Sequence, residues 1–146
     1  MGIIQDFYAD FSDNNVVCYM SEFAFHKYVL NQGIIGRKDG LFVIPEKYAR
    51  RIEEEKRENI VEYRREIARK LGLNEKELER GIVKITIPVE LVQNLHIPCG
   101  LESGCNNKWI HGGKTITGIR EGVVNQITRE AEPELYDYVI NNIVRI

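Results

Sequence analysis

The chain has 146 residues, of which 43% are hydrophobic and 29% are charged, and its formal net charge is −2. These values are typical of a globular domain, and the length fits one hydrophobic core, so we expect a single domain over residues 1–146. The near balance of charge excludes a polycation, so a nucleic acid would have to contact a local basic patch.

No apolar run approaches the roughly 18 residues that cross a bilayer, and the start MGIIQDFYADFSDNN lacks the pattern of a signal peptide. The cysteines number three, which argues against a disulfide framework and favours a reducing compartment. We therefore expect no membrane partner and a cytoplasmic site of action, for a protein that is complete or is excised from a longer one.

Two short apolar runs, with a helical pattern between them, occupy the first third of the chain. The polar, aspartate-rich stretch before residue 15 indicates an arm or a first helical turn. Residues 15–20 and 41–44 read as strands, and residues 22–32 as a helix. Ser21 is a plausible cap for that helix and Gly33 ends it.

Residues 46–71 carry the clearest helical pattern. Apolar side chains recur there on one stripe: Tyr48, Ile52, Ile60, Tyr63, Ile67 and Leu71. The entirely polar run EEEKREN between Ile52 and Ile60 predicts that the helix breaks or extends into solvent. Gly72 ends the region, and Asn74 can cap a short helix after it.

Later strands are expected at residues 82–88, where apolar and polar residues alternate, and at residues 122–128. After Pro133 the pattern predicts a helix running into a final strand. Strands and helices mix without regular βαβ units, so the predicted fold class is α+β, with a mainly antiparallel twisted sheet and packed helices in one domain.

A glycine-rich segment from His96 to Glu121 is the predicted working surface. Six of the twelve glycines fall between Gly100 and Gly122. From Cys99 to Arg120, three basic residues against one glutamate give a formal charge of +2. Long segments without regular structure are often functional, and glycines let backbone amides approach an anion closely.

Several side chains of this segment suit chemistry on a phosphate or a ribose. His111 is titratable, Lys114 is cationic, and Thr115 and Thr117 are hydroxyl donors, all within seven residues. Glu121 is a lone carboxylate at a strand edge. The expected substrate contacts are Trp109, Arg120, Tyr19 and Asn107. The alternative is a structured surface loop whose glycines only make turns.

Two cysteines and two histidines, His96, Cys99, Cys105 and His111, lie within sixteen residues and could wrap a zinc ion. Their spacing is not that of a standard finger and contains no CxxC. We therefore expect neither a metal nor any other cofactor.

Short elements of the chain resemble a known family. They are Gly40-Leu41-Phe42-Val43-Ile44-Pro45, Ile87-Pro88, Pro98-x-Gly100, Gly112-Gly113 and Gly118-Ile119-Arg120-Glu121. Their layout is similar to the C-terminal toxin domains of bacterial polymorphic toxins, including those of contact-dependent growth inhibition systems. The resemblance implies a ribonuclease or an ADP-ribosyltransferase-like, NAD-consuming domain, and a cognate immunity protein as partner.

The favoured function is metal-independent cleavage of cellular RNA, with tRNA as one possible substrate. His111 would act as acid or base, and His96 or His26 as the second proton-transfer group. Lys114, with Arg120, would hold the phosphate, and Trp109 would stack on an unpaired base.

The first alternative is NAD consumption, by ADP-ribosyl transfer or NAD glycohydrolysis. Glu121 would then stabilise the ribose as nicotinamide leaves, and Tyr19 or Trp109 would stack on the nicotinamide. The second alternative is a non-enzymatic binding module.

Overall fold

The computed structural model describes residues 3–12, 14–98, 109–110, 114–115 and 118–146. In chain order the elements are α1 (Ile3–Asp10), β1 (Asn15–Ser21), α2 (Glu22–Ala24), the π-helix η1 (Phe25–Leu30), β2 (Ile34–Ile35), β3 (Leu41–Pro45), α3 (Glu46–Glu54), α4 (Ile60–Leu71), α5 (Glu75–Leu78), β4 (Ile82–Pro88), the 3-10 turn η2 (Val89–Leu91), β5 (Trp109–Ile110), β6 (Lys114–Thr115), β7 (Gly122–Val124), β8 (Ile127–Thr128), α6 (Pro133–Asn141) and β9 (Val144–Arg145).

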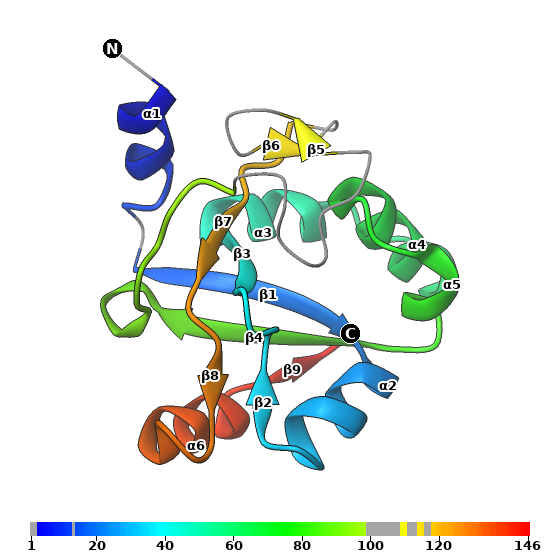
Figure 1. Cartoon of the computed structure of the whole chain (residues 1–146). Coiled ribbons are helices and arrows are strands. Elements are labelled where there is room, and N and C mark those ends of the chain that lie inside the picture. The colour runs from blue at the N-terminus through cyan, green and yellow to red at the C-terminus, as the bar shows by residue number, and fades with distance from the viewer. Residues whose placement is uncertain (1–2, 13, 99–108, 111–113, 116–117) are drawn as a thin grey trace.

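The main sheet has five strands in the order β7-β3-β1-β4-β9 (Figure 1). Every pairing in it is antiparallel, with Val17 opposite Ile44 across β1 and β3, and Phe42 opposite Val123 across β3 and β7. Two smaller antiparallel pairs, β2–β8 and β5–β6, complete the described strands. The predicted α+β class with an antiparallel sheet is therefore confirmed.

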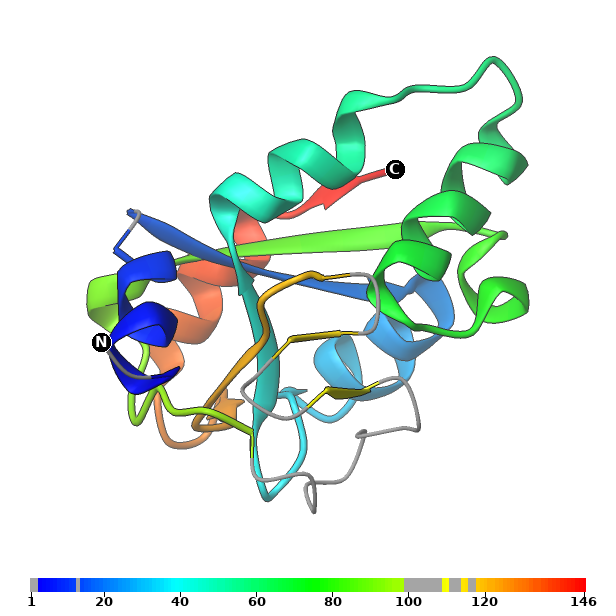
Figure 2. The same cartoon turned by 90° about the horizontal axis from the view of Figure 1, so that it is seen from above.

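Helices cover both faces of the sheet, and the alternation of β1 shows how the sequence divides between them. Val16 and Cys18 belong to the core shared with η1 and α6, whereas Val17 and Tyr19 belong to the core under α3, α4 and α5. Figures 1 and 2 show these helices on opposite sides of β1 and β4. None of the helices in the described part of the chain combines the length and the apolar character of a transmembrane span.

The helical region at 46–71 breaks where the polar run predicted it. α3 ends at Glu54, and α4 begins at Ile60 after Asn59, whose side chain accepts hydrogen bonds from two backbone N–H groups of the new helix. The four residues that matter most to this prediction are all at most 8% exposed: Tyr48, Ile52, Tyr63 and Ile67. Ile60 is 47% exposed, because it opens the helix at the solvent-facing break.

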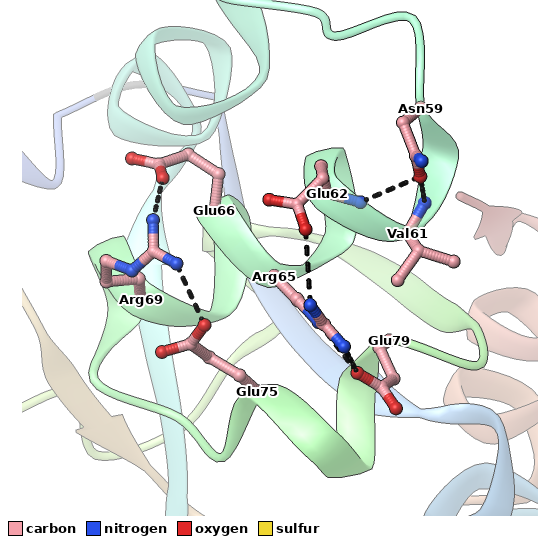
Figure 3. A network of polar contacts seen from close by, with 8 residues as sticks. All are labelled: Asn59, Val61, Glu62, Arg65, Glu66, Arg69, Glu75 and Glu79. Atoms are coloured by element: carbon pink, nitrogen blue, oxygen red, sulfur yellow. Dashed lines mark hydrogen bonds and ion pairs between the residues drawn. The ribbon is translucent and has the colours of Figure 1, made fainter.

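Arginine–glutamate ion pairs within α4 and between α4 and the α5 region offset much of the charge of these helices (Figure 3). Arg65 contacts Glu62 within α4 and Glu79 after α5, and Arg69 contacts Glu66 and Glu75 in the same manner. The arginines of these pairs are 40% and 51% exposed, so each pair stabilises the fold weakly. Because both arginines are paired with glutamates, their positive charge is offset locally.

Ile67 is completely buried in the core under α4 and tests this packing directly. Ile67→Ala should lower the free energy of unfolding by about 2–5 kcal/mol, because it leaves a cavity that a close-packed core fills poorly. Urea unfolding followed by circular dichroism measures the effect. A loss below 0.5 kcal/mol, as at an ordinary surface site, would contradict the assigned packing.

Three elements differ from the prediction. The stretch before residue 15 contains a helix of eight residues, α1, because Phe7 within it and Phe11 directly after it are buried in the core. The strand predicted at 122–128 is two strands of different sheets, β7 and β8, separated at Asn125 and Gln126. The predicted helix at 22–32 continues from α2 as a π-helix, whose Phe25 and Val29 are buried.

Candidate functional site

Part of the predicted site lies outside the described residues. This holds for His111, Thr117 and Asn107. The predicted Trp109, Lys114 and Thr115 belong to the β5–β6 pair, in which Trp109 is opposite Thr115 and Ile110 is opposite Lys114. In Figures 1 and 2 this pair lies on the side of the sheet that carries α3 and α4.

Glu121 stands directly before β7 and is partly buried. Within the described part of the chain, no hydrogen bond or ion pair to its carboxylate is found. Burial raises the pKa of Glu121 to about 7, because a charged carboxylate loses hydration there. An acid that is half ionised near neutral pH is suited to proton transfer.

Residues 119 to 124 alternate between the two faces of the sheet, which fixes the direction of Glu121. Ile119 packs against the core under α3 and α4. Arg120 contacts Asp10 of α1, and a Cβ on Gly122 would approach Phe11 Cζ to 2.8 Å. Since successive residues of an extended chain point to opposite faces, Glu121 faces the α3 and α4 side, the side of the β5–β6 pair.

Arg120 is a buried ion-pair partner, with 4% of its surface exposed. Its Nε donates to Asp10 Oδ2 at 2.8 Å, and the guanidinium lies 5.6 Å from the Phe7 ring centroid. Lys47 Nζ is 3.0 Å from Asp10 Oδ1. In the structure, the Arg120 side chain therefore links α1 to the residues before β7, and it does not lie open for the predicted phosphate contact.

The charge state of Asp10 follows from these neighbours. Burial alone would raise the pKa of Asp10, but hydrogen bonds and charge from Arg120 and Lys47 outweigh it and lower the pKa below its ordinary value. Asp10 was not identified from the sequence, because its partner is 110 residues away and no local pattern joins them.

Tyr19, predicted to stack on a substrate, is buried on β1 with 8% of its surface exposed. Its hydroxyl hydrogen-bonds to Glu53 Oε2, and Lys84 Nζ lies 2.8 Å from the same oxygen. Burial and the Glu53 carboxylate raise the pKa of Tyr19 strongly. A ring and hydroxyl enclosed in this way are not open to a nicotinamide, so the stacking role assigned to Tyr19 does not fit this structure.

Of the four residues in the predicted zinc pattern, the structure describes only His96. Its Nδ1 lies 2.6 Å from the backbone oxygen of Asn94. Cys99, Cys105 and His111 are beyond the described residues. Among those that are described, no group of three His, Cys, Asp or Glu side chains is arranged to hold a metal ion. The remaining cysteine, Cys18, is buried, and burial raises the pKa of its thiol to about 12, so it stays protonated.

Comparison with known proteins gives no family: no family model matches the chain, and no curated protein matches it significantly. The distinctive feature of the site is the partly buried carboxylate of Glu121, which has no hydrogen bond or ion pair to another described residue and lies at the end of the predicted anion-binding segment. Such a group can accept a proton from, or hydrogen-bond to, a hydroxyl that is brought to it.

Proposed function

We propose that the chain is a metal-independent ribonuclease in which Glu121 is the general base. The observation that carries the proposal is the Glu121 carboxylate, which is partly buried, faces the side of the β5–β6 pair and has a pKa of about 7. Perturbed carboxylates of this kind concentrate at functional sites. A base with a pKa near the working pH transfers protons efficiently.

The proposed reaction is an internal transfer of the phosphodiester. Glu121 takes the proton of a ribose 2′-hydroxyl, and the 2′-oxygen attacks the adjacent phosphorus. The bond from phosphorus to the 5′-oxygen breaks, and that oxygen takes a proton from a general acid. The products are a 2′,3′-cyclic phosphate and a free 5′-hydroxyl, and no oxidant, reductant or metal is consumed.

The sequence supplies the other roles of this proposal. Lys114 stabilises the extra negative charge on the phosphorane, and hydroxyls of Thr115 and Thr117 donate to its oxygens. Trp109 stacks on an unpaired base and Asn107 contacts it. His111 is one source of the leaving-group proton, and His96 is another.

NAD consumption is the second candidate, because it too needs a carboxylate near a ribose hydroxyl and Glu121 can supply one. Two observations make it the weaker candidate. A group with a pKa near 7 is half protonated at neutral pH and therefore stabilises a cationic ribose less well than a fully ionised glutamate. Tyr19, one of the two residues expected to stack on the nicotinamide, is buried and hydrogen-bonded to Glu53.

The biological setting proposed with this activity is that of a toxin-like effector acting on cytoplasmic RNA. A cognate immunity protein would cover the active surface, and an acidic face on it would match the +2 segment from Cys99 to Arg120 and speed association. Growth arrest on cytoplasmic expression, relieved by co-expression of that partner, supports this setting. Absence of toxicity counts against it.

The direct test incubates the purified protein with total RNA in EDTA, and in parallel with NAD. We expect RNA fragments ending in 2′,3′-cyclic phosphate, detected by enzymatic end analysis, while NAD stays intact. Intact RNA with depleted NAD would replace the proposal by the second candidate. Cleavage that EDTA abolishes would contradict the metal-independent mechanism.

A further inference from the structure

His96 lies on the chain segment that pairs with the outer edge of β7. The backbone N–H of His96 donates to the carbonyl of Val123 at 2.9 Å, and the N–H of Val123 donates back at 2.9 Å. Directly opposed residues of an antiparallel pair point to the same face. His96 is therefore on the face of Val123, which is also the face of Glu121.

The neighbour of His96 confirms this direction. A Cβ on Gly122 would approach Leu95 Cδ1 to 2.9 Å, so Leu95 is on the α1 face with Gly122. His96, the next residue, then lies on the opposite face. The Cα atoms of diagonal neighbours across such a pair are about 7–8 Å apart, so the side chains at positions 96 and 121 are near neighbours on this face.

The His96 ring is held in one orientation. Its Nδ1 is 2.6 Å from the Asn94 carbonyl oxygen, which can only accept, so Nδ1 carries a proton and Nε2 is left for proton transfer. Asn94 has a positive φ of 61°, which is uncommon for a residue other than glycine. Two hydrogen bonds from Asn125 stabilise this turn. Its backbone N–H donates to the Gln93 carbonyl oxygen, and its side-chain oxygen accepts from the Asn94 side-chain amide.

From this geometry we infer that His96 is the general acid of the site, whose Nε2–H protonates the leaving 5′-oxygen while Glu121 takes the 2′-hydroxyl proton. This inference rests on the proposed ribonuclease function. The two groups act on opposite ends of one phosphodiester, so one proton is gained and one is lost. After the products leave, Glu121 releases its proton to water and His96 takes one from water, which restores both groups.

His26, the other imidazole among the described residues, does not fit this role. It lies on η1, whose buried residues Phe25 and Val29 pack in the core of the opposite face. Its side chain is 59% exposed, and its Nε2 is 3.2 Å from Glu22. His26 is therefore a matched surface control for His96.

The test compares two substrates in wild type, His96→Ala, His96→Gln and His26→Ala. One is RNA, whose 5′-oxygen needs a proton to leave. The other is uridine 3′-(4-nitrophenyl phosphate), whose nitrophenolate leaves without one. We expect both His96 variants to lose about 10²–10⁴ in rate on RNA but less than about tenfold on the nitrophenyl ester, since the general base is retained. His26→Ala should match wild type on both.

Equal losses on the two substrates would overturn the inference, because a general acid is not needed for nitrophenolate. Unchanged RNA cleavage in His96→Ala would overturn it as well, and would leave the ribonuclease proposal intact. A wild type inactive on both substrates would refute the ribonuclease proposal itself. Thermal unfolding of each variant shows whether a loss reflects unfolding, and His96→Gln, which keeps a polar side chain, serves where His96→Ala does not fold.

Discussion

Glu121→Gln should lower RNA cleavage by about 10²–10⁴, the usual loss on removal of a general base. Glutamine has the shape of glutamate but cannot take the 2′-hydroxyl proton. In the wild type, kcat/KM should fall as the pH drops below about 7, because burial holds the pKa of Glu121 at about 7 and the protonated acid is not a base. Initial rates on an oligoribonucleotide across pH 5–9 measure both effects.

The same variant should be more stable than the wild type above pH 7. The folded pKa of Glu121 is raised from 4.5 to about 7, so the folded state binds the proton more tightly than the unfolded state does. Stability from this group is therefore complete below pH 4.5 and is lost as the pH rises to 7. The loss is on the order of 1–3 kcal/mol, and Glu121→Gln should remove this pH dependence.

Glu130→Gln is the matched control, because Glu130 is exposed in a turn a few residues further on. It should change neither the cleavage rate nor the stability profile measured by thermal melts at several pH values. If Glu121→Gln cleaves RNA at the wild-type rate, Glu121 is not the base. If it also leaves the stability profile unchanged, Glu121 does not have the raised pKa that its burial implies.

Asp10→Ala should lower the free energy of unfolding by about 3–5 kcal/mol, the usual cost of removing one partner from a buried ion pair. Arg120, 4% exposed, would lose the carboxylate that its Nε contacts. Arg120→Met should cost less, because Asp10 keeps Lys47 at 3.0 Å and is partly open to water. Chemical denaturation of the two variants measures this asymmetry.

Asp137→Ala, at an exposed position of α6, is the control for loss of an aspartate and should change stability by no more than about 0.5 kcal/mol. A cost of Asp10→Ala in that same small range would show that the contact between α1 and Arg120 does not stabilise the fold. A larger cost for Arg120→Met than for Asp10→Ala would contradict the assigned burial of the pair.

The sequence predicted the parts of the fold that local patterns determine. Alternation identified β4, and the polar run between Ile52 and Ile60 marked the end of α3. The prediction failed where tertiary contacts determine the structure. The N-terminal stretch forms α1 because Phe7, and Phe11 directly after the helix, are buried in the core. Residues 122–128 divide into two strands because β8 pairs with β2 instead of continuing β7.

Within the site, the sequence identified Glu121 as a lone carboxylate at a strand edge and assigned it to the NAD alternative, while Arg120 beside it was expected to contact the substrate. Arg120 was predicted to contact phosphate from the local charge of its segment, because its ion-pair partner Asp10 is distant in the chain. His96 was one of two open choices for a proton-transfer group. Only its pairing with Val123, a long-range backbone contact, distinguishes it from His26.

The alternation from Ile119 to Val124 also bears on which changes in length this domain can tolerate. Arg120 and Glu121 are consecutive and face opposite sides of the sheet, so inserting or deleting one residue between them and β7 would exchange the two. The cation would then face the site and the acid would meet Asp10. We therefore expect natural variants to have no insertions or deletions within residues 119–124. The spacing of this segment keeps Arg120 on the buried face and Glu121 on the face of the proposed site.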